Sequence, residues 1–531
     1  MSASAPAAPQ YPDKLDAAVL KVAGVVVLGA IMSILDITVV SVALPTFANE
    51  FDTTLATVAW TMTGYTLALA TVIPLTGWAA DRFGTKRLYI AALVLFTLGS
   101  VACAMADSIE MLIAFRVLQG LGGGMLMPLG MTIMTRAAGP DRIGRLMAVL
   151  GIPMLLGPIS GPILGGWLID AFSWHWIFLI NLPIGIVAIV YAAMVLPKDT
   201  ESASESFDLL GMLLLSPGLA AFLFGVSSIA EGGDGVHLGP RVWVSATIGV
   251  ILIVAFVFHA FRPEHPLIDL RLFRNRRLTI STIAMFVFII AFMGAGLLFP
   301  SYFLQVRGET TLMAGLLIAP QGIGAMLTMP IAGALADRVP VGRTVPFAML
   351  LIAAGFIAFT QVGPDTSYWV LCGSLFVMGL GMGGTMMPIM TSALKSLTNA
   401  EVARGSTLVN IAQQVGSSVG AAVMSVILTN RLQGSGTVAG AVDPQTGEAF
   451  TEAELAIASQ MQPDSVAQMN LPADLVDRGL SFAADAFAGT FTVALVLVLV
   501  AIVPAAFLPR KKEESALLDD ADGTAPPVML H

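Results

Sequence analysis

Two charged residues, Asp36 and Arg116, lie inside stretches of the chain that are otherwise apolar. Asp36 falls within a run that begins near Ala18 and continues to Pro45, which is long enough to cross a bilayer. An ionised aspartate inside such a helix costs about 2.5 to 3.5 kcal/mol on insertion scales, so a carboxylate retained there points to a function and to a charged partner. At about 1.5 Å per residue, both side chains lie roughly 9 to 12 Å below the same end of their spans, which makes Arg116 the candidate partner.

A buried carboxylate beside a guanidinium can carry a proton. The guanidinium favours the ionised form and burial favours the protonated form, so a change in the wetting of a cavity around Asp36 would load or unload the proton. The alternative is a static pair that joins two spans, although buried ion pairs stabilise less well than apolar packing. In the second half of an internal repeat the matching positions are Ala291 and Phe376, so the charges are absent there. We therefore predict proton-coupling chemistry in the N-terminal half.

The composition places these residues in a membrane protein. Of the 531 residues, 56% are hydrophobic and 11% are charged, whereas a soluble domain carries roughly 25% charged residues. The net charge of -9 comes from acids in loops and in the tail, and nothing indicates a nucleic-acid partner. The two cysteines, Cys103 and Cys372, lie in apolar runs, which excludes a disulfide framework, and no metal-ligand cluster is visible.

Long apolar runs predict an all-α polytopic membrane protein with about fourteen spans, near residues 20–44, 58–80, 88–107, 110–135, 144–169, 176–196, 209–230, 241–260, 278–305, 312–336, 344–361, 367–393, 403–430 and 487–509. With the N-terminus inside, only Arg241, Arg307, Arg431 and Arg478 fall on the outer side. Of the 26 Lys and Arg residues, Arg116 is in the membrane and the other 21 are inside (26 − 4 − 1). The positive-inside rule then predicts the inner (cytoplasmic) membrane with both termini cytoplasmic.

The sequence also repeats itself at long range. The segment from Gly77 to Arg82 returns as Gly333 to Arg338, 256 positions later (337 − 81 for the two aspartates). Two homologous halves explain this, with two extra spans between the copies. The predicted divisions are a disordered N-terminus (1–17), an N-terminal six-helix bundle that couples protons (18–196), a linker with two extra helices (197–277), a C-terminal six-helix bundle (278–509) with an outer insertion (431–486), and a cytoplasmic tail (510–531).

Several motifs together resemble one family. Gly77 to Arg87 resembles the loop between spans 2 and 3 of the major facilitator superfamily, and Arg116 to Gly120 resembles its span 4 motif. Gly151 to Gly166 resembles the span 5 motif of its antiporters, and Trp174 to Gly185 completes a pattern similar to the fourteen-span drug:proton antiporters. The resemblance covers nearly the whole chain except the outer insertion and the tail. It implies the major facilitator fold, with two six-helix bundles plus two extra central helices.

The repeated loops are the predicted gates. The resemblance implies that Asp81 caps a neighbouring helix and pairs with a basic residue when the inner side is closed. The gating residues predicted from the two copies are Gly77, Asp81, Arg82, Gly84, Asp337 and Arg338. The second copy has only two basic residues and an intruding proline, Pro340, which predicts a weaker gate. For Lys86 and Arg87 the alternative is simple anchoring at the inner surface.

The span 5 run contains an antiporter motif of small residues and prolines, Gly157, Pro158, Gly161, Pro162 and Gly165. The glycines form a small-xxx-small face that lets a neighbouring backbone approach closely, and the prolines kink the helix. We expect this tight, bent span to lie at the interface of the two halves and to seal the closed state. The alternative is ordinary helix packing.

The candidates for substrate contact are uncharged polar, aromatic and methionine side chains. Asn410, Gln413 and Gln414 share one helical face, and Met and Phe number 28 each, which suits promiscuous binding. The predicted lining residues are Tyr65, Gln119, Met125, Met127, Phe299, Gln321, Met387, Asn410 and Gln413. The alternative for the amides is hydrogen bonding between helices, and most of the apolar side chains are expected to pack or to face lipid.

The resulting hypothesis is a proton-coupled antiporter that exports amphipathic, lipophilic drugs by alternating access. It is driven by the proton gradient, needs no cofactor and is not an enzyme; no ATP-binding loop occurs in the sequence. One alternative is an exporter of lipids or cell-envelope precursors, and another is a non-transporting membrane sensor or scaffold. The expected partners are small molecules or lipids and the membrane itself. We predict a monomer, and the sequence leaves open a periplasmic adaptor.

Overall fold

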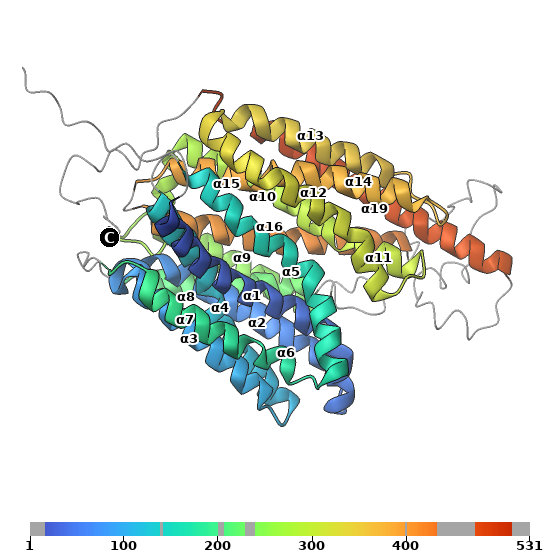
Figure 1. Cartoon of the computed structure of the whole chain (residues 1–531), viewed down its shortest axis with the longest axis horizontal. Helices are drawn as coiled ribbons and strands as arrows, with labels where there is room; N and C mark the ends of the chain where they lie inside the picture. The colour runs from blue at the N-terminus through green and yellow to red at the C-terminus, as the bar shows by residue number, and fades with distance from the viewer. Residues whose placement is uncertain are drawn as a thin grey trace, which may run out of the picture.

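The chain folds into long α-helices (Figure 1). The computed structural model describes residues 16–138, 142–199, 207–228, 239–398, 401–432 and 473–511, and these ranges contain no strand. The first helices are α1 (Ala17–Glu50), α2 (Leu55–Phe83), α3 (Thr85–Ala104), α4 (Ile109–Ala138), α5 (Ile143–Ala171), α6 (Trp176–Leu179) and α7 (Asn181–Val195). The later ones are α8 (Leu209–Ser227), α9 (Pro240–Ala260), the 3₁₀ turn η1 (Leu270–Arg274), α10 (Arg276–Gly296), α11 (Leu298–Gln305), α12 (Thr311–Arg338), α13 (Val341–Phe359), α14 (Tyr368–Gly383), α15 (Met386–Lys395), α16 (Val402–Leu432) and α19 (Ala473–Ala506).

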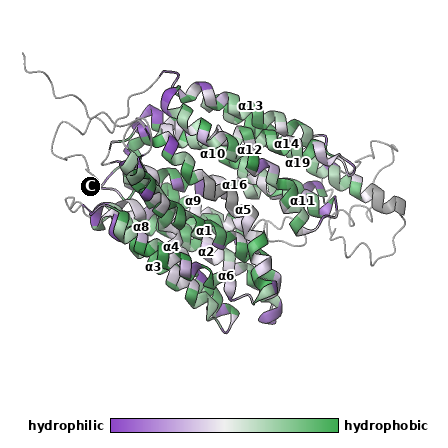
Figure 2. Cartoon of the chain, viewed as in Figure 1, coloured by the Kyte–Doolittle hydropathy of each residue, from purple (hydrophilic) through white to green (hydrophobic). Residues whose placement is uncertain are grey.

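Most of these helices are long enough to cross a bilayer. Thirteen helical segments in the described ranges combine sufficient length with sufficient hydropathy. α5, with 29 residues, is a further helix of that length, although several of its side chains lie outside the description. Figure 2 shows apolar residues along the helices and hydrophilic residues mainly toward their ends. The predicted all-α polytopic membrane fold is confirmed.

Three predicted spans are interrupted by short breaks. α6 and α7 are separated at Ile180, α10 and α11 at Leu297, and α14 and α15 at Gly384. Each break precedes a proline by three or four residues, namely Pro183, Pro300 and Pro388. A proline lacks the N–H that would reach back one turn, and its ring clashes with the carbonyl there, so the helix bends or breaks.

The helices form two bundles. α1 to α7 pack on one another, as do α10 to α19, and we call these the N-terminal and C-terminal bundles. The end where α1 begins and α2 and α12 finish carries Lys86, Arg142 and Lys395, and we call it the basic end. The opposite, or far, end carries α6 and α11, and the bundles diverge toward it in Figure 1.

The predicted flanking regions fall mostly outside the described residues. This applies to nearly all of the predicted N-terminus, the cytoplasmic tail and the middle of the outer insertion. α16 runs to Leu432, and α19 begins at Ala473, which is 14 residues before the predicted span at 487 (487 − 473). The last span therefore extends into the segment that was predicted to be an insertion.

The two extra helices form a hairpin beside α2. α8 packs against α9, α2 and α16, so it touches both bundles. Two aromatic pairs join the hairpin to α2, Trp60 with Phe224 on α8 and Trp78 with Phe207 just before α8, with ring centroids 5.4 and 4.4 Å apart. Because α2 and α8 run in opposite directions, one pair lies toward each end of the hairpin.

The start of this hairpin is fixed by Asp208. Its carboxylate caps α8 by accepting the Gly211 N–H at 2.8 Å, and it also accepts the Leu267 N–H at 3.1 Å and lies 2.7 Å from Nε2 of His259. Burial raises the pKa of Asp208, but the hydrogen bonds from His259, Gly211 and Leu267 outweigh it, so the pKa lies below the usual range. The carboxylate therefore remains ionised near neutral pH.

Candidate functional site

The structure brings Asp36 and Arg116 together inside the N-terminal bundle. Oδ2 of Asp36 on α1 forms an ion pair with NH1 of Arg116 on α4. The two residues are 1% and 0% exposed, which makes Arg116 one of the largest fully buried side chains in the described ranges. A charge this deeply buried is tolerated only when its donors are satisfied.

Neighbouring groups accept two further hydrogen bonds from Arg116. Its Nε donates to the carbonyl of Thr61 on α2 at 3.1 Å, and NH1 also donates to Oε1 of Gln119 at 2.7 Å. The guanidinium lies over the ring of Tyr65, 4.2 Å from its centroid, and a cation over an aromatic face is attracted by the ring quadrupole. Arg116 is thus fixed by two carbonyl-type oxygens and a ring in addition to the carboxylate.

The second oxygen of Asp36 accepts two amide donors. Oδ1 lies 2.8 Å from Nε2 of Gln119 and 3.2 Å from Nδ2 of Asn181, the first residue of α7. Asn181 also donates to Oγ of Ser100 on α3 at 3.0 Å, and Ser100 donates to the carbonyl of Phe178 at 2.9 Å. We call Asp36, Arg116, Gln119, Asn181, Ser100, Thr61 and Tyr65 the Asp36 network.

Three members of this network were not predicted from the sequence. Asn181 and Ser100 are short polar residues in apolar runs, and Thr61 contributes only its backbone carbonyl. The amide of Asn181, beside a proline-induced break, is the one signal that could have found them. Gln119 and Tyr65 were predicted to line a substrate site, whereas the structure places both against the ion pair, buried at 0% and 1%.

The glycine face of α5 packs closely against the turn of α1 that carries Asp36. A Cβ on Gly157 would lie 2.1 Å from Ile34, and one on Gly161 would lie 2.1 Å from Oγ1 of Thr38. Thr38 donates to the carbonyl of Gly157 at 3.2 Å, and Gly165 meets Val39. The side chains of Pro158 and Pro162 lie outside the described residues.

The span lies at the interface of the two halves as expected, since α5 packs against α12, but the glycines of the motif do not face that interface. Gly157, Gly161 and Gly165 pack within the N-terminal bundle, not across the interface between the bundles. α5 reaches the C-terminal bundle with a different set of glycines, because a Cβ on Gly144 would lie 2.5 Å from the carbonyl of Gly333, and one on Gly151 would lie 2.0 Å from Met329. The glycines of the antiporter-like motif therefore pack against the segment of α1 that carries Asp36. The contact between the two bundles is made by glycines of α5 nearer the basic end.

The first repeated loop joins the bundles at the basic end. Asp81, near the end of α2, lies 3.4 Å from Nε of Arg404 on α16 and 3.9 Å from NH2 of Arg136 on α4. Its side chain is 22% exposed. Gly77, one turn earlier, allows the close approach, because a Cβ there would lie 3.3 Å from Cα of Arg404.

The second repeated loop makes shorter contacts. Asp337 lies 2.8 Å from Nζ of Lys395 and accepts the backbone N–H groups of Gly144 and Arg145 at 3.0 and 3.2 Å. Its side chain is 2% exposed. It thus caps the start of α5, where the helix dipole favours a negative charge. The prediction of a weaker second gate counted the basic residues of its own loop, whereas the structure shows that the partners of Asp337 come from other elements. The relative strength of the two gates stays a prediction.

The arginines within the two motifs lie at the surface, and their predicted gating role stays a prediction. Arg82 and Arg338 are exposed, and the basic residues that the structure sets beside the two aspartates are Arg404, Arg136, Lys395 and Arg145. Gly84 has a φ of 87°, and a Cβ there would lie 2.1 Å from the carboxyl carbon of Asp199. That carboxylate accepts the N–H groups of Lys86 and Arg87 and so caps α3.

The other predicted lining residues are dispersed. Phe299 stacks with Phe356 and Phe491 and is 1% exposed, and Met387 is 2% exposed, so both belong to the core of the C-terminal bundle. Met125 and Met127, on α4, are partly buried against the hydrophobic core, which runs through both bundles. Nε2 of Gln321 is buried and finds no hydrogen-bond partner among the described residues.

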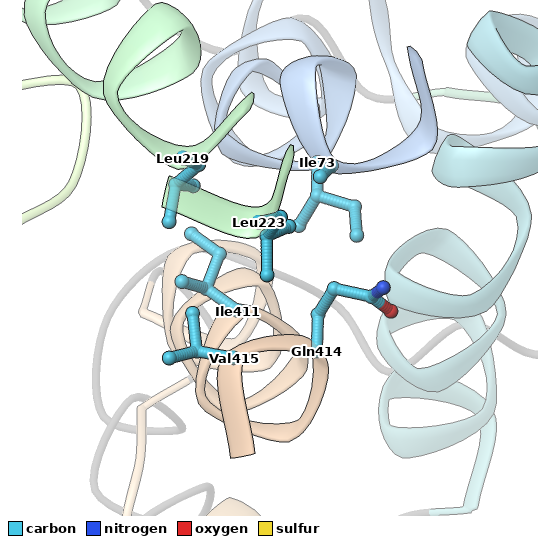
Figure 3. A pocket seen from close by; sticks show the side chains of 7 residues that line it. Ile73, Leu219, Leu223, Ile411, Gln414 and Val415 are labelled. Atoms are coloured by element: carbon cyan, nitrogen blue, oxygen red, sulfur yellow. The ribbon is translucent and has the colours of Figure 1, made fainter. Parts of the chain in front are cut away.

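The amides of α16 lie near the contact between the bundles. Asn410 donates to the carbonyl of Ser406 at 2.8 Å and lies 3.2 Å from the sulfur of Met131, on α4 of the other bundle. Gln413 lies 3.4 Å from the sulfur of Met285. Figure 3 shows Gln414 beside a narrow apolar crevice between α2, α8 and α16, lined by Ala70, Ile73, Leu219, Leu223, Ile411, Gln414 and Val415.

A helical protein of two bundles that meet at one end, with an ion pair buried deep inside the N-terminal bundle, has the architecture of a secondary membrane transporter. The model of the Major Facilitator Superfamily matches residues 26–421, and the chain belongs to this superfamily. It is a multi-pass membrane transporter and not an enzyme.

Two relatives illustrate the similarity. The chain is 49% identical to "Multidrug resistance protein B homolog" of Mycobacterium tuberculosis over 510 residues, covering 94% of this chain and 92% of that protein. It is 30% identical to "Multidrug export protein EmrB" of Escherichia coli K12 over 409 residues, covering 76% of this chain and 79% of that protein.

Solved structures support the fold alone. The human organic anion transporter MFSD10 (TETRAN) matches with a TM-score of 0.58 and 16% identity, over 92% of this chain and 100% of that one. The proton:xylose symporter XylE matches with a TM-score of 0.56 and 13% identity, over 95% and 98% of the two chains.

Proposed function

We propose that this protein is a proton-coupled antiporter that exports amphipathic, lipophilic small molecules across the cytoplasmic membrane by alternating access. The observation that carries the proposal is the buried Asp36–Arg116 pair, which has no charged counterpart at Ala291 in the other bundle. The names of the relatives, which describe multidrug resistance and multidrug export, support the substrate class. The predicted orientation places the basic end in the cytoplasm, so the bundles would here be closed toward the inside.

One proton is energetically sufficient for this task. A proton that enters across about 100 mV and one pH unit supplies about 2.3 + 1.4 kcal/mol, which sustains roughly a 500-fold gradient of a neutral compound. In the proposed cycle the ionised Asp36 is held by Arg116 and two amides, and proton uptake releases part of this hold. The α1 turn that bears Asp36 also packs on the glycine face of α5, which in turn contacts α12 of the other bundle.

The test measures proton movement in sealed, acid-interior vesicles that contain the wild type, Asp36→Asn, or Glu110→Gln as a control. Glu110 is an exposed carboxylate on the same helix as Arg116. The compounds added in turn are ethidium as a lipophilic cation, Nile red as a neutral dye, and a fluorescent phospholipid.

We expect addition of a drug-like compound to dissipate the pH gradient with the wild type and with Glu110→Gln, but not with Asp36→Asn. The opposite result would be that no drug-like compound has an effect while phospholipid movement persists in the wild type and in Asp36→Asn. Asp36 would then be structural, and a lipid exporter would replace the proposal.

A further inference from the structure

Asn181 is a buried amide with two polar partners, and one of them is the carboxylate of Asp36. Its Nδ2 is 3.2 Å from Oδ1 of Asp36 and 3.0 Å from Oγ of Ser100, and the residue is 2% exposed. An amide nitrogen has two hydrogens, so both bonds can form at once. Asn181 therefore joins α7 to both α1 and α3.

The ionised carboxylate of Asp36 accepts on both oxygens, from Arg116 on Oδ2 and from Gln119 and Asn181 on Oδ1. A protonated carboxyl group becomes a donor on one oxygen, so that oxygen no longer offers the same acceptor sites. Proton binding must therefore weaken or displace at least one of the three donors.

Of the three donors, Asn181 is the one best placed to leave. Its contact with Oδ1 is 3.2 Å, longer than the 2.8 Å contact of Gln119. It retains Ser100 as an acceptor after it leaves, and Ser100 is itself fixed to the carbonyl of Phe178. Arg116, by contrast, carries a full charge that is costly to separate from a carboxylate in a buried site.

The surroundings of Asp36 contain few other groups that could take the proton. Arg116 faces it from α4, Tyr65 from α2 and Cys103 from α3. α7 contributes the amide of Asn181 rather than a charge. α5 contacts this turn of α1 through Gly157 and Gly161. On the α7 side, the hydrogen bond that changes when Asp36 is protonated is therefore the one from Asn181.

We propose that Asn181 is a positioning residue that holds Asp36 in its ionised form and releases it on proton binding. The release passes the protonation state of α1 to the span formed by α6 and α7, which is interrupted at Ile180, next to Asn181. This inference rests on the proposed proton-coupled function, because it assigns a role within that cycle. The hydrogen bond itself can be tested without any substrate.

The first experiment is infrared difference spectroscopy of the full-length protein in lipid membranes, with the Asp36 carboxylate band assigned by comparison with Asp36→Asn. The test variant is Asn181→Leu, which has a similar shape and no donor. The control is Thr97→Val on α3, because Thr97 packs against Gly185 of α7 while its hydroxyl, among the described residues, donates to the carbonyl of Leu93 and not to the Asp36 network. We expect the carboxylate band to shift in Asn181→Leu and to stay at the wild-type position in Thr97→Val.

The second experiment measures the pH profile of drug-driven proton movement in the same vesicles. A hydrogen bond to a charged group is worth about 1.5 kcal/mol or more, and 1.36 kcal/mol corresponds to one pH unit. We therefore expect the half-maximal point to move by about one unit toward higher pH in Asn181→Leu, because the ionised form has lost a donor, and to be unchanged in Thr97→Val.

The two failures are distinguishable. Coupled transport by the wild type, with the band and the pH profile unchanged in Asn181→Leu or shifted equally in Thr97→Val, would overturn the role of Asn181. A specific band shift in Asn181→Leu, with no proton coupling in the wild type, would support the hydrogen-bond assignment and overturn the proposed function and the role of Asn181 within it.

Discussion

The two repeated loops carry the same Gly-Asp-Arg pattern, but their aspartates differ in burial and in the contacts that the structure shows for them. Asp337 is 2% exposed and has an ammonium and two backbone N–H groups within 3.2 Å, whereas Asp81 is 22% exposed and its nearest guanidinium nitrogen is 3.4 Å away. Each acid lies beside the first turn of a helix in the other bundle, α5 for Asp337 and α16 for Asp81. A motif thus specifies where an acid lies, while its burial and partners decide how strongly it acts.

The comparison predicts that removing the charge of Asp337 has the largest effect. Asp337→Asn leaves the ammonium of Lys395 without its counter-ion in a nearly buried site, which costs about 3 kcal/mol or more. Hydrogen–deuterium exchange should then show protection of the first turn of α5 falling by about a hundredfold. Unchanged exchange at Gly144 and Arg145 would mean that the cap is not important for closure of the basic end.

The glycines of the two contacts should rank in the same order. A Cβ on Gly144 would lie 2.5 Å from a backbone carbonyl, whereas the nearest atom to a Cβ on Gly77 is a side-chain oxygen at 3.2 Å. We expect Gly144→Ala to destabilise the closed contact by about 1–3 kcal/mol and Gly77→Ala by less. Distances between spin labels at the basic ends of α5 and α12, and of α2 and α16, would measure both. An equal response would remove the distinction between the two loops.

Neutralising Asp81 should have a smaller effect. Exposed or partly exposed ion pairs contribute about 1 kcal/mol or less, so Asp81→Asn should shift the same spin-label populations less than about fivefold. Arg82→Gln is the matched control, because Arg82 is exposed and the basic side chains set beside Asp81 belong to Arg404 and Arg136. A larger shift for Arg82→Gln than for Asp81→Asn would show that the loop arginine forms the gate.

Asp16, an acid at the start of α1, provides the reference for a mostly exposed group. The Val19 N–H, and then Arg142, hold the pKa of Asp16 below its usual value of 3.8, although burial opposes them. Because the folded-state pKa is the lower one, the stabilisation is present above about pH 4 and is lost as the pH falls through the lowered pKa. Asn is an equally good cap, so the melting temperatures of Asp16→Asn and the wild type should differ above about pH 4 and converge as the pH falls through the lowered pKa. A difference in melting temperature that does not shrink on acidification would exclude the charge as its cause.

The sequence predicts well those features that depend on long apolar runs and on charge within them. The number of spans and the joining of Asp36 to Arg116 follow from hydropathy, helix rise and the cost of a buried charge. The breaks at Ile180 and Leu297 were missed because proline tolerance in membrane helices depends on neighbours. The glycines of α5 predict a close contact with a neighbouring helix. The sequence does not identify that helix as α1, because this depends on which side of α5 faces each bundle.

The site was predictable only in part. Charged residues in apolar segments can be recognised in the sequence, whereas the groups that complete the site, such as Asn181 and the Thr61 carbonyl, come from other helices and carry no charge. The partners of Asp337 were not predicted because Lys395 lies 58 residues away along the chain and the capped amides lie in its other half.

The aromatic pairs on α8 have a mechanical consequence. Phe224 near the end of α8, and Phe207 just before its start, attach the hairpin to α2, while the side chains that line the crevice between α8 and α16 are mainly aliphatic, such as Leu219 and Ile411. If the bundles rotate as proposed, the hairpin travels with the N-terminal bundle, and the sliding surface lies between α8 and α16. The hairpin would then cover one side of the contact between the two bundles and separate it from the lipid acyl chains throughout the cycle.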